Sequence, residues 1–435
     1  MHVGKGLDQA DPEVGELLRS EADRQRQALH LLAPAMLTST WLRQLMASDA
    51  GNLDGEGYVV LHDLPAARRA MAEGGYRSQK FNPCGQYMEF AEARAAQEVA
   101  RAFRPTHPSG LQVNLHPVSG TSANLAALMG VAGTGDAVVA LDPKSGGHIS
   151  HGAGFHLSGR HFRFSHIVLG KGCDAFPLTA VEELLVREKP VAMILGSSSF
   201  PWPIPWQEVA DIRTAVSPET VFIADVAHFA GLVLTGHYPN PVMVADVVTG
   251  VGYKSMGGPK SGFILTHRDD LHERIARALF PGLQGAPRMA DIIATGVAAR
   301  LAVGAEFRTA MAGAIALRER IQAGLAARDV RPAFGGSGTH MLVLNLGSRA
   351  SEVSGRLERA GILQNANMLP GDPSGKRPSG IRLGTIGLIQ QGLIPGDGAE
   401  IAELCAAVIA DHISDEEARS QVIMLRDRGR QRLDG

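Results

Sequence analysis

Residues 220–263 read TVFIADVAHFAGLVLTGHYPNPVMVADVVTGVGYKSMGGPKSGF, and this stretch decides the fold. It contains short apolar runs, at 220–229 and 245–253, that are bounded by Gly, Pro or Asp. Similar runs precede it at 137–142 and 190–197, and helical segments separate them. Buried runs that alternate with helices are typical of a parallel sheet that is covered on both faces. The sequence therefore predicts an α/β fold with a mostly parallel central sheet and helices on both faces.

Polar side chains stand at the ends of these apolar runs. Asp225 ends one run with His228 close behind it, and Lys254 lies among small and apolar residues after the next run. Open α/β sheets bind ligands at the carboxyl ends of their strands. A buried lysine has a lowered pKa, and its neutral amine can form a Schiff base. Taken singly, Asp225 could instead cap the following helix, and Lys254 could lie on the surface.

A third candidate is the junction between a predicted strand at 111–118 and a predicted helix at 122–133. Ser119, Gly120 and Thr121 supply hydroxyls and backbone N–H groups at this helix N-terminus, which suits a phosphate group. An ordinary helix N-cap is the alternative. Read together with the later acid and lysine, the chain order is that of pyridoxal phosphate chemistry. In that chemistry a lysine binds the cofactor and an acid pairs with its ring nitrogen.

The composition is that of a globular enzyme. Of 435 residues, 45% are hydrophobic and 20% are charged, and at about 150 residues per domain we expect two or three structural units. A net charge of −2 gives no support to nucleic acid or a membrane as a partner. The three cysteines match no metal spacing and suit a reducing cytosol, and no apolar stretch is long enough to span a membrane. We expect a cytoplasmic protein without a metal site.

Four segments are expected along the chain. Residues 1–58 form an N-terminal helical arm, residues 59–79 an insertion or loop, residues 80–287 a large cofactor-binding domain, and residues 288–435 a smaller C-terminal α/β domain. The smaller domain begins with a long helical region. In the arm, Asp11-Pro12 begins a helix. The apolar stripe of that helix consists of Val14, Leu17, Leu18 and Leu29. The stripe must pack on the main body or on a partner subunit.

Several motifs between Asp11 and Leu393 carry a resemblance to a known family. They are DPEV, SGTSAN, GGHISHG, ADVAHFAGL, DVVTGVGYKSMGGPKSGF, FPGLQGAPR and RPSGIRLGT. By these motifs the chain resembles the serine hydroxymethyltransferase family of fold-type-I pyridoxal-phosphate-dependent transferases. The resemblance implies an amino acid substrate, tetrahydrofolate as co-substrate, a role in one-carbon metabolism, and a homodimer with shared active sites.

The resemblance also implies roles for individual residues. Lys254 is expected to form the Schiff base, Asp225 to pair with the pyridine nitrogen, and His148 to stack on the ring. The implied cofactor-binding residues are Ser119, Gly120, Thr121, His148, Ser199, Asp225, His228, Tyr253, Lys254 and Gly285, the last toward the phosphate of the neighbouring subunit. The implied substrate-binding residues are Arg382, Asn367 and Asn82. Arg382 is expected to hold the substrate carboxylate through two N–H bonds, and Asn367 to contact a pterin.

The chain departs from the family pattern around the substrate. The acid/base glutamate of the family, which Gly-Tyr follows, matches Glu56 when no gap is introduced, and Glu73 in AEGGY is a second candidate. A family tyrosine pair becomes Phe81-Asn82, an early serine becomes Pro34, and the histidine before the lysine becomes Tyr253. These changes remove polar groups near the substrate. An α-substituted serine, or an aldehyde acceptor other than formaldehyde, would fit the altered site.

These observations predict reversible transfer of a hydroxymethyl group. The donor is serine or an α-substituted serine, the product is glycine or an alanine-like amino acid, and tetrahydrofolate accepts the one-carbon unit. The alternative is a folate-independent aldolase or transaldolase that acts on β-hydroxy amino acids such as threonine. Asn367 favours folate, whereas the missing tyrosines and the insertion favour the alternative. A homologue that binds the cofactor without catalysis is disfavoured, because Lys254, Asp225, His148 and Arg382 are all present.

Overall fold

The computed structural model describes residues 6–81, 85–104 and 110–434. Within these ranges, a central sheet has the strand order β2-β8-β7-β6-β5-β3-β4. Its strands are β2 (Gln112–Asn114), β3 (Ala137–Leu141), β4 (Arg163–Ile167), β5 (Ala192–Gly196), β6 (Val221–Asp225), β7 (Val247–Val251) and β8 (Gly262–Thr266). The strands from β4 to β7 run parallel, whereas β8 and β2 are antiparallel to their neighbours. The predicted fold class, α/β with a mostly parallel sheet, is confirmed.

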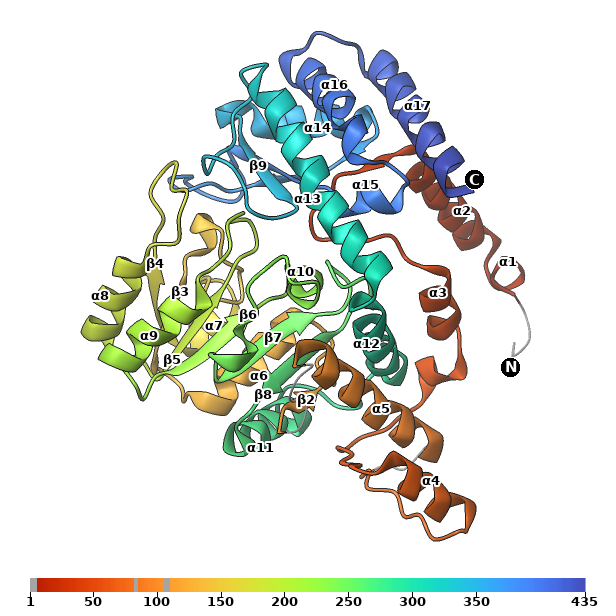
Figure 1. Cartoon of the computed structure of the whole chain (residues 1–435), viewed down its shortest axis with the longest axis vertical. Helices are drawn as coiled ribbons and strands as arrows, with labels where there is room; N and C mark the ends of the chain where they lie inside the picture. Colours follow the sequence, from red (N-terminus) through yellow and green to blue (C-terminus); the bar gives the residue numbers. More distant parts are fainter. Residues whose placement is uncertain (1–5, 82–84, 105–109, 435) are drawn as a thin grey trace.

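Helices cover both faces of this sheet (Figure 1). They are α5 (Gln86–Phe103), α6 (Gly120–Val131), α7 (Leu157–His161), α8 (Leu178–Glu188), α9 (Trp206–Val216), α10 (Ala230–Leu234), α11 (Asp269–Arg277) and α12 (Met289–Ala302). Successive side chains of a strand point to opposite faces. Val139 therefore packs in one core cluster with Phe103 and Trp206, and Val138 packs in another with Leu128. Burial on both faces explains why the strands are apolar throughout.

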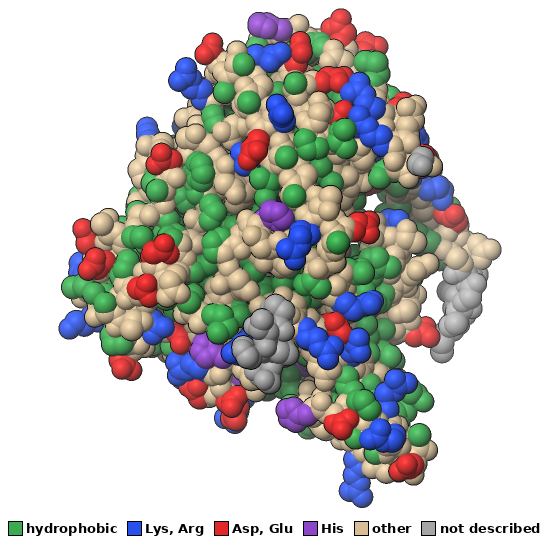
Figure 2. All heavy atoms as spheres, viewed as in Figure 1, with side chains coloured by type: hydrophobic (Ala, Val, Ile, Leu, Met, Phe, Trp, Pro, Cys, Tyr) green, Lys and Arg blue, Asp and Glu red, His purple; other side chains and the backbone are tan. Residues whose placement is uncertain are grey.

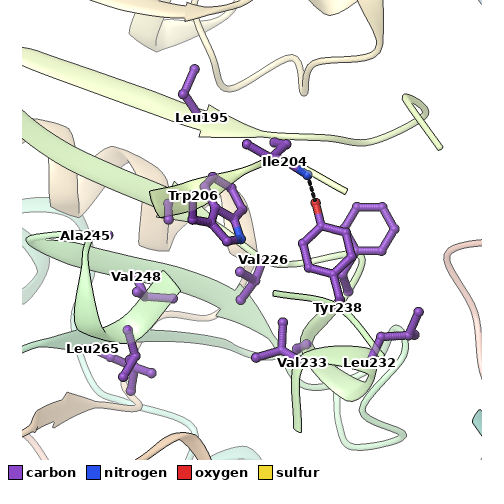
Figure 3. Close-up of a cluster of buried hydrophobic side chains, with 14 of the residues drawn as sticks. Leu195, Ile204, Trp206, Val226, Leu232, Val233, Tyr238, Ala245, Val248 and Leu265 are labelled. Atoms are coloured by element: carbon purple, nitrogen blue, oxygen red, sulfur yellow. Dashed lines mark hydrogen bonds between the residues drawn. The ribbon is translucent and has the colours of Figure 1, made fainter. Parts of the chain in front are cut away.

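Figure 3 shows part of one of these core clusters, between strands of the central sheet and the segment after β6. Trp206 and Tyr238 pack there beside Leu195 and Val226. The ring of Tyr238 stacks on Phe229 at 4.4 Å, and its oxygen accepts the backbone N–H of Ile204 at 3.0 Å. This packing fixes the turn that follows β6.

A second α/β unit lies above the first in Figure 1. Its sheet has the order β11-β12-β9, with β9 (Met341–Asn345), β11 (Asn365–Asn367) and β12 (Gly380–Gly384) antiparallel. Its helices are α13 (Ala305–Ala326), α14 (Ala350–Arg359), α15 (Ile386–Gln390), α16 (Gly398–Ala410) and α17 (Asp415–Asp434). They enclose a hydrophobic cluster of their own, with Leu357 and Ile401 among its members.

The N-terminal arm consists of α1 (Leu7–Ala10), α2 (Pro12–Gln27), β1 (Leu29–His30) and α3 (Thr40–Met46). Asp11 caps α2 by accepting the N–H of Val14 at 3.1 Å, so the predicted helix start is confirmed. The prediction that Leu29 belongs to the apolar stripe of this helix is wrong, because α2 ends at Gln27. Leu29 is instead buried in β1, which pairs with β10 (Ile362–Leu363). The part of the arm with α2 and β1 is thereby built into the smaller unit, whereas α3 packs on α12.

The insertion contains one helix, α4 (Leu64–Ala72), which projects at the bottom of Figure 1. The buried carboxylate of Glu89 on α5 fastens its return segment, because it accepts hydrogen bonds from Tyr76, Ser78 and the backbone of Gln79. The insertion therefore has a defined attachment to the large sheet's covering helices.

Two features differ from the sequence expectation. The long helical region at 289–328 is broken between α12 and α13, where the N–H of Gly304 turns back to Leu301. Strand β4, with the sequence RFSHI, was not predicted, because it is partly exposed and lacks a continuous apolar run. No helix in the described ranges is long and apolar enough to cross a membrane. Acidic and basic side chains intermix over the face in Figure 2, as the near-zero net charge leads one to expect.

Candidate active site

The carboxyl ends of β6 and β7 place Asp225 and Lys254 at the same edge of the sheet. Asp225 is the last residue of β6, and Lys254 follows the end of β7 in a tight loop. A cavity at this edge is lined by Ser119, Gly120, Thr121, Asn124, His148, Ser197, Asp225, Ala227, His228, Val251, Tyr253 and Lys254. Most of the residues proposed from the sequence to bind a cofactor thus line one cavity.

Lys254 is buried, with 7% of its surface exposed. Burial lowers the pKa of its amine to about 8, while the carboxylate of Asp225 opposes and the charge of Arg382 assists this shift. The ring of Tyr253 lies 5.9 Å from the Lys254 Nζ. Because a neutral amine is the nucleophile in imine formation, the environment prepares Lys254 for that reaction.

Asp225 is held by several hydrogen-bond donors. Its Oδ2 accepts the amide of Asn124 at 2.8 Å and lies 3.1 Å from Nε2 of His151, and its Oδ1 accepts the N–H of Ala227 at 2.8 Å. Burial alone raises the pKa of Asp225, but the hydrogen bonds and charge of His151 outweigh burial and hold it below its usual range. Asp225 therefore stays ionised, as a partner for a protonated ring nitrogen must.

Sequence reasoning missed Asn124 and His151 as functional residues. Both lie inside motifs that the resemblance rests on, SGTSAN and GGHISHG, which is the signal that could have found them. Asn124 is itself fixed, because its side-chain oxygen accepts the hydroxyl of Thr249 at 2.6 Å. Together these side chains set the orientation of the Asp225 carboxylate.

Two other histidines border the cavity. His148 bonds through Nδ1 to Ser150 Oγ at 2.7 Å, and burial, with the nearby His151, lowers its pKa to about 4. Burial and the charge of Lys254 lower the pKa of His228 well below its usual value. Nδ1 of His228 is buried without a hydrogen-bond partner among the described residues. Both rings are thus neutral at physiological pH, and one has a polar atom left for a ligand.

The N-terminus of α6 forms a cradle at one end of the cavity. Ser119 caps the helix. Its hydroxyl oxygen accepts the backbone N–H of Ser122, and the hydroxyl oxygen of Ser122 accepts the backbone N–H of Ser119. The first N–H groups of a helix have no partner within it, so those of Gly120 and Thr121 remain for an anion. A Cβ on Gly120 would lie 2.7 Å from Val251 Cγ1, so a larger residue here would have to displace that side chain on the cavity wall.

Ser199 lies beside the cavity rather than on its wall. The backbone N–H groups of Ser198 and Ser199 donate to the carbonyl of Gly146, at 2.7 and 3.1 Å. Gly146 has a φ of +96°, and a Cβ there would lie 2.6 Å from the backbone nitrogen of Phe200. Ser197, which the sequence did not single out, lines the cavity instead.

Arg382 reaches this region from β12 of the smaller unit. Its Nε donates to Asn365 Oδ1 at 3.1 Å, and its Nη1 donates to the backbone and side-chain oxygens of Ser198. Burial lowers the pKa of Arg382 to about 10, so the guanidinium stays charged at neutral pH. A fixed, desolvated guanidinium suits a carboxylate ligand. Asn367, on the neighbouring strand β11, donates its side-chain amide to the carbonyl of Met368 at 2.6 Å.

The remaining candidates lie elsewhere. Glu56 is adjacent to Gly285, because a Cβ on Gly285 would lie 3.9 Å from Glu56 Oε1. Neither residue is among those that line the cavity of Lys254. Glu73 is exposed at the end of α4 in the insertion, and Asn82 lies outside the described residues. Within one chain, the structure thus brings Glu56 and Gly285 together, apart from Lys254.

The cavity residues fit pyridoxal phosphate. A buried amine, an ionised acid, a neutral histidine and a helix N-terminus that begins with a closely packed glycine surround one space. These groups match the aldehyde, ring nitrogen, ring face and phosphate of this cofactor.

Comparison with known proteins agrees with this site. The family model for serine hydroxymethyltransferase matches residues 7–405. Serine hydroxymethyltransferase of Anaplasma phagocytophilum is 31% identical over 93% of this chain and 90% of its own length. The enzymes of the same name from Desulforapulum autotrophicum and Myxococcus xanthus are 32% and 30% identical, over 95% and 96% of this chain and 94% of their own length.

Enzymes of this family act on amino acids and use pyridoxal phosphate, with tetrahydrofolate as co-substrate. The predicted family and the predicted cofactor are therefore confirmed. The chain belongs to the serine hydroxymethyltransferase family and is a pyridoxal-phosphate-dependent transferase.

Proposed function

We propose that this enzyme reversibly transfers a hydroxymethyl group between serine, or an α-substituted serine, and glycine, or an alanine-like amino acid, with tetrahydrofolate as the one-carbon acceptor. The observation that carries the proposal is the meeting of Lys254, Asp225 and Arg382 at one edge of the sheet, in a chain of this family. An amine, an acid and a buried guanidinium supply attachment, charge and carboxylate recognition.

Each of these side chains has a distinct task in the proposed reaction. When bound, pyridoxal phosphate supplies an electron sink for the bond that breaks at the substrate α carbon. Lys254 would hold the cofactor through its buried amine, and the ionised Asp225 would hold a proton at the ring nitrogen. Arg382 orients the amino acid by its carboxylate, with the guanidinium plane fixed by Asn365 and Ser198.

An acid/base residue must move the proton of the substrate hydroxyl, and we assign this role to Glu56. Its position beside Gly285 supports this choice over Glu73, which is exposed in the insertion. Because Glu56 and Gly285 do not line the cavity of their own chain, the proposal includes a second copy whose cavity they complete. The active enzyme is then a homodimer with shared active sites.

An altered amino acid substrate is supported by a separate apolar pocket of about 530 Å³. Pro34 and Tyr253, two of the departures from the family pattern, both line it, together with Met36 and Gly257. Tyr253 also lines the cavity of Lys254. Tyr253 is thus shared by the two cavities, and a bulkier α substituent would meet the apolar part of a pocket that also carries Lys260, Arg288 and Asp291.

A second candidate function is a folate-independent aldolase or transaldolase that acts on β-hydroxy amino acids such as threonine. It is favoured by the missing tyrosines and by the insertion at 59–79, whereas Asn367 keeps its side-chain oxygen and one amide N–H for a pterin contact.

A substrate panel separates the two functions. Serine, α-methylserine and threonine would each be supplied with and without tetrahydrofolate, while amino acid and aldehyde products are measured. The proposed function predicts turnover of serine or α-methylserine that depends on tetrahydrofolate. Aldehyde release from threonine at the same rate without tetrahydrofolate would establish the second candidate instead. Preference for serine over α-methylserine would remove the α-substituted substrate from the proposal.

A further inference from the structure

A buried ionic cluster lies between α5 and the segment that carries Glu56. Glu92 on α5 is 6% exposed, and its two carboxylate oxygens contact different partners. Oε2 lies 2.5 Å from the Lys80 Nζ, and Oε1 lies 2.7 Å from Nε2 of His116. Lys80 and His116 are also buried, at 8% and 3%. Charges are seldom buried without a partner, and here one carboxylate holds two groups.

The first partner leads directly to Glu56. Nζ of Lys80 donates to the carbonyl of Gly57 at 2.8 Å, and the N–H of Phe81 donates to the carbonyl of Glu56 at 2.9 Å. Gly57 has a φ of +95°, and a Cβ there would lie 2.7 Å from the nitrogen of Phe81. The backbone carbonyls of Glu56 and Gly57 are therefore both hydrogen-bonded to residues 80–81, the segment that Glu92 anchors through Lys80.

The second partner leads to both Glu56 and Gly285. The ring of His116 stacks on Tyr58 at 4.5 Å, and the Tyr58 hydroxyl donates to the carbonyl of Ala276 at 2.9 Å. The backbone carbonyl of His116 accepts the side-chain amide of Gln284, the residue before Gly285, at 2.7 Å. One histidine thus fixes Tyr58, two residues after Glu56, and the turn that carries Gly285.

From these contacts we propose that Glu92 is a positioning residue, which holds Glu56 and the Gln284–Gly285 turn in register with each other. Lys80 links Glu92 to the Glu56 segment alone, whereas His116 links Glu92 to the Glu56 segment and to the Gln284–Gly285 turn. The inference rests on the proposed function, in which Glu56 moves the substrate proton. Glu92 itself touches neither cofactor nor substrate, so its loss acts through the placement of Glu56.

The test compares Glu92→Gln with a matched control, Glu98→Gln. Glu98 lies on the same helix and pairs with Arg94 at 2.6 Å, but its partners do not lead to Glu56. Because a displacement of about 1 Å can cost a hundredfold in rate, we expect Glu92→Gln to lower kcat by about ten- to hundredfold. The KM for the amino acid should change little, since Arg382 is untouched, and Glu98→Gln should stay within about twofold of the parent.

Two further measurements separate positioning from general damage. In the double variant Glu56→Gln/Glu92→Gln, kcat should be no lower than in Glu56→Gln alone, because the residues act on one step. Hydrogen exchange of the holoenzyme should rise at both 56–58 and 284–285 in Glu92→Gln. In Lys80→Met it should rise at 56–58 only, since the His116 contact is retained.

The proposal is overturned if exchange at both segments matches the parent, or if the losses from Glu56→Gln and Glu92→Gln multiply. An unchanged visible spectrum of bound pyridoxal phosphate, together with faster exchange at the two segments, supports it. If Glu56→Gln keeps the parental kcat, the assignment of Glu56 under the proposed function fails. The exchange data then still decide whether Glu92 holds the two segments.

Discussion

The amine of Lys254 offers the most direct quantitative test of the site. A free lysine amine has a pKa of 10.5, and burial lowers that of Lys254 to about 8. At pH 7 a group with a pKa of about 8 is about one-tenth neutral, whereas one at 10.5 is about 0.03% neutral. The neutral, reactive fraction is thus about 300-fold larger, which corresponds to a free-energy cost of about 3 kcal/mol for keeping the buried amine charged.

The assay mixes apoprotein with pyridoxal phosphate and follows C=N bond formation by its visible absorbance over a range of pH. The rate should rise about tenfold between pH 6 and pH 7 and level off above about pH 8, because it follows the neutral fraction of Lys254. Lys254→Ala should give no bond, and Lys260→Ala, an exposed lysine of the same loop, should keep the parental midpoint. A parental rate that still climbs through pH 10 would show that burial does not tune this amine.

Three other predictions concern binding and local stability. Arg382→Lys should raise the KM of the amino acid about ten- to hundredfold without changing the cofactor spectrum, because lysine cannot donate two parallel bonds; an unchanged KM would refute carboxylate binding there. Gly120→Ala should weaken pyridoxal phosphate binding about tenfold in equilibrium dialysis, since the new Cβ strikes Val251; equal affinity would contradict the cradle. Glu89→Gln should speed proteolysis within 59–79, because Tyr76 and its neighbours lose a buried carboxylate, and equal cleavage would argue against that anchor.

Much of the site could be predicted because its groups follow strand ends. In a parallel sheet the ends of neighbouring strands meet at one edge, so Asp225 and Lys254 are brought together by topology alone. The cradle at Ser119 and Gly120 is equally local, being a strand-to-helix turn with a capping residue. Strand β4 was missed because, at the edge of the sheet, it lacks the apolar run that marks a strand buried on both faces.

The sequence by itself determined the fold class, the cofactor and the order of the residues that surround it, because strand–turn–helix patterns and their end residues are local properties. Tertiary structure alone decided which groups hold Asp225, and it placed Glu56 against Gly285, far along the chain. It also decided that Glu92 joins Lys80 to His116. Contacts of this kind depend on how helices and loops pack across the sheet, and no periodicity in the chain encodes them.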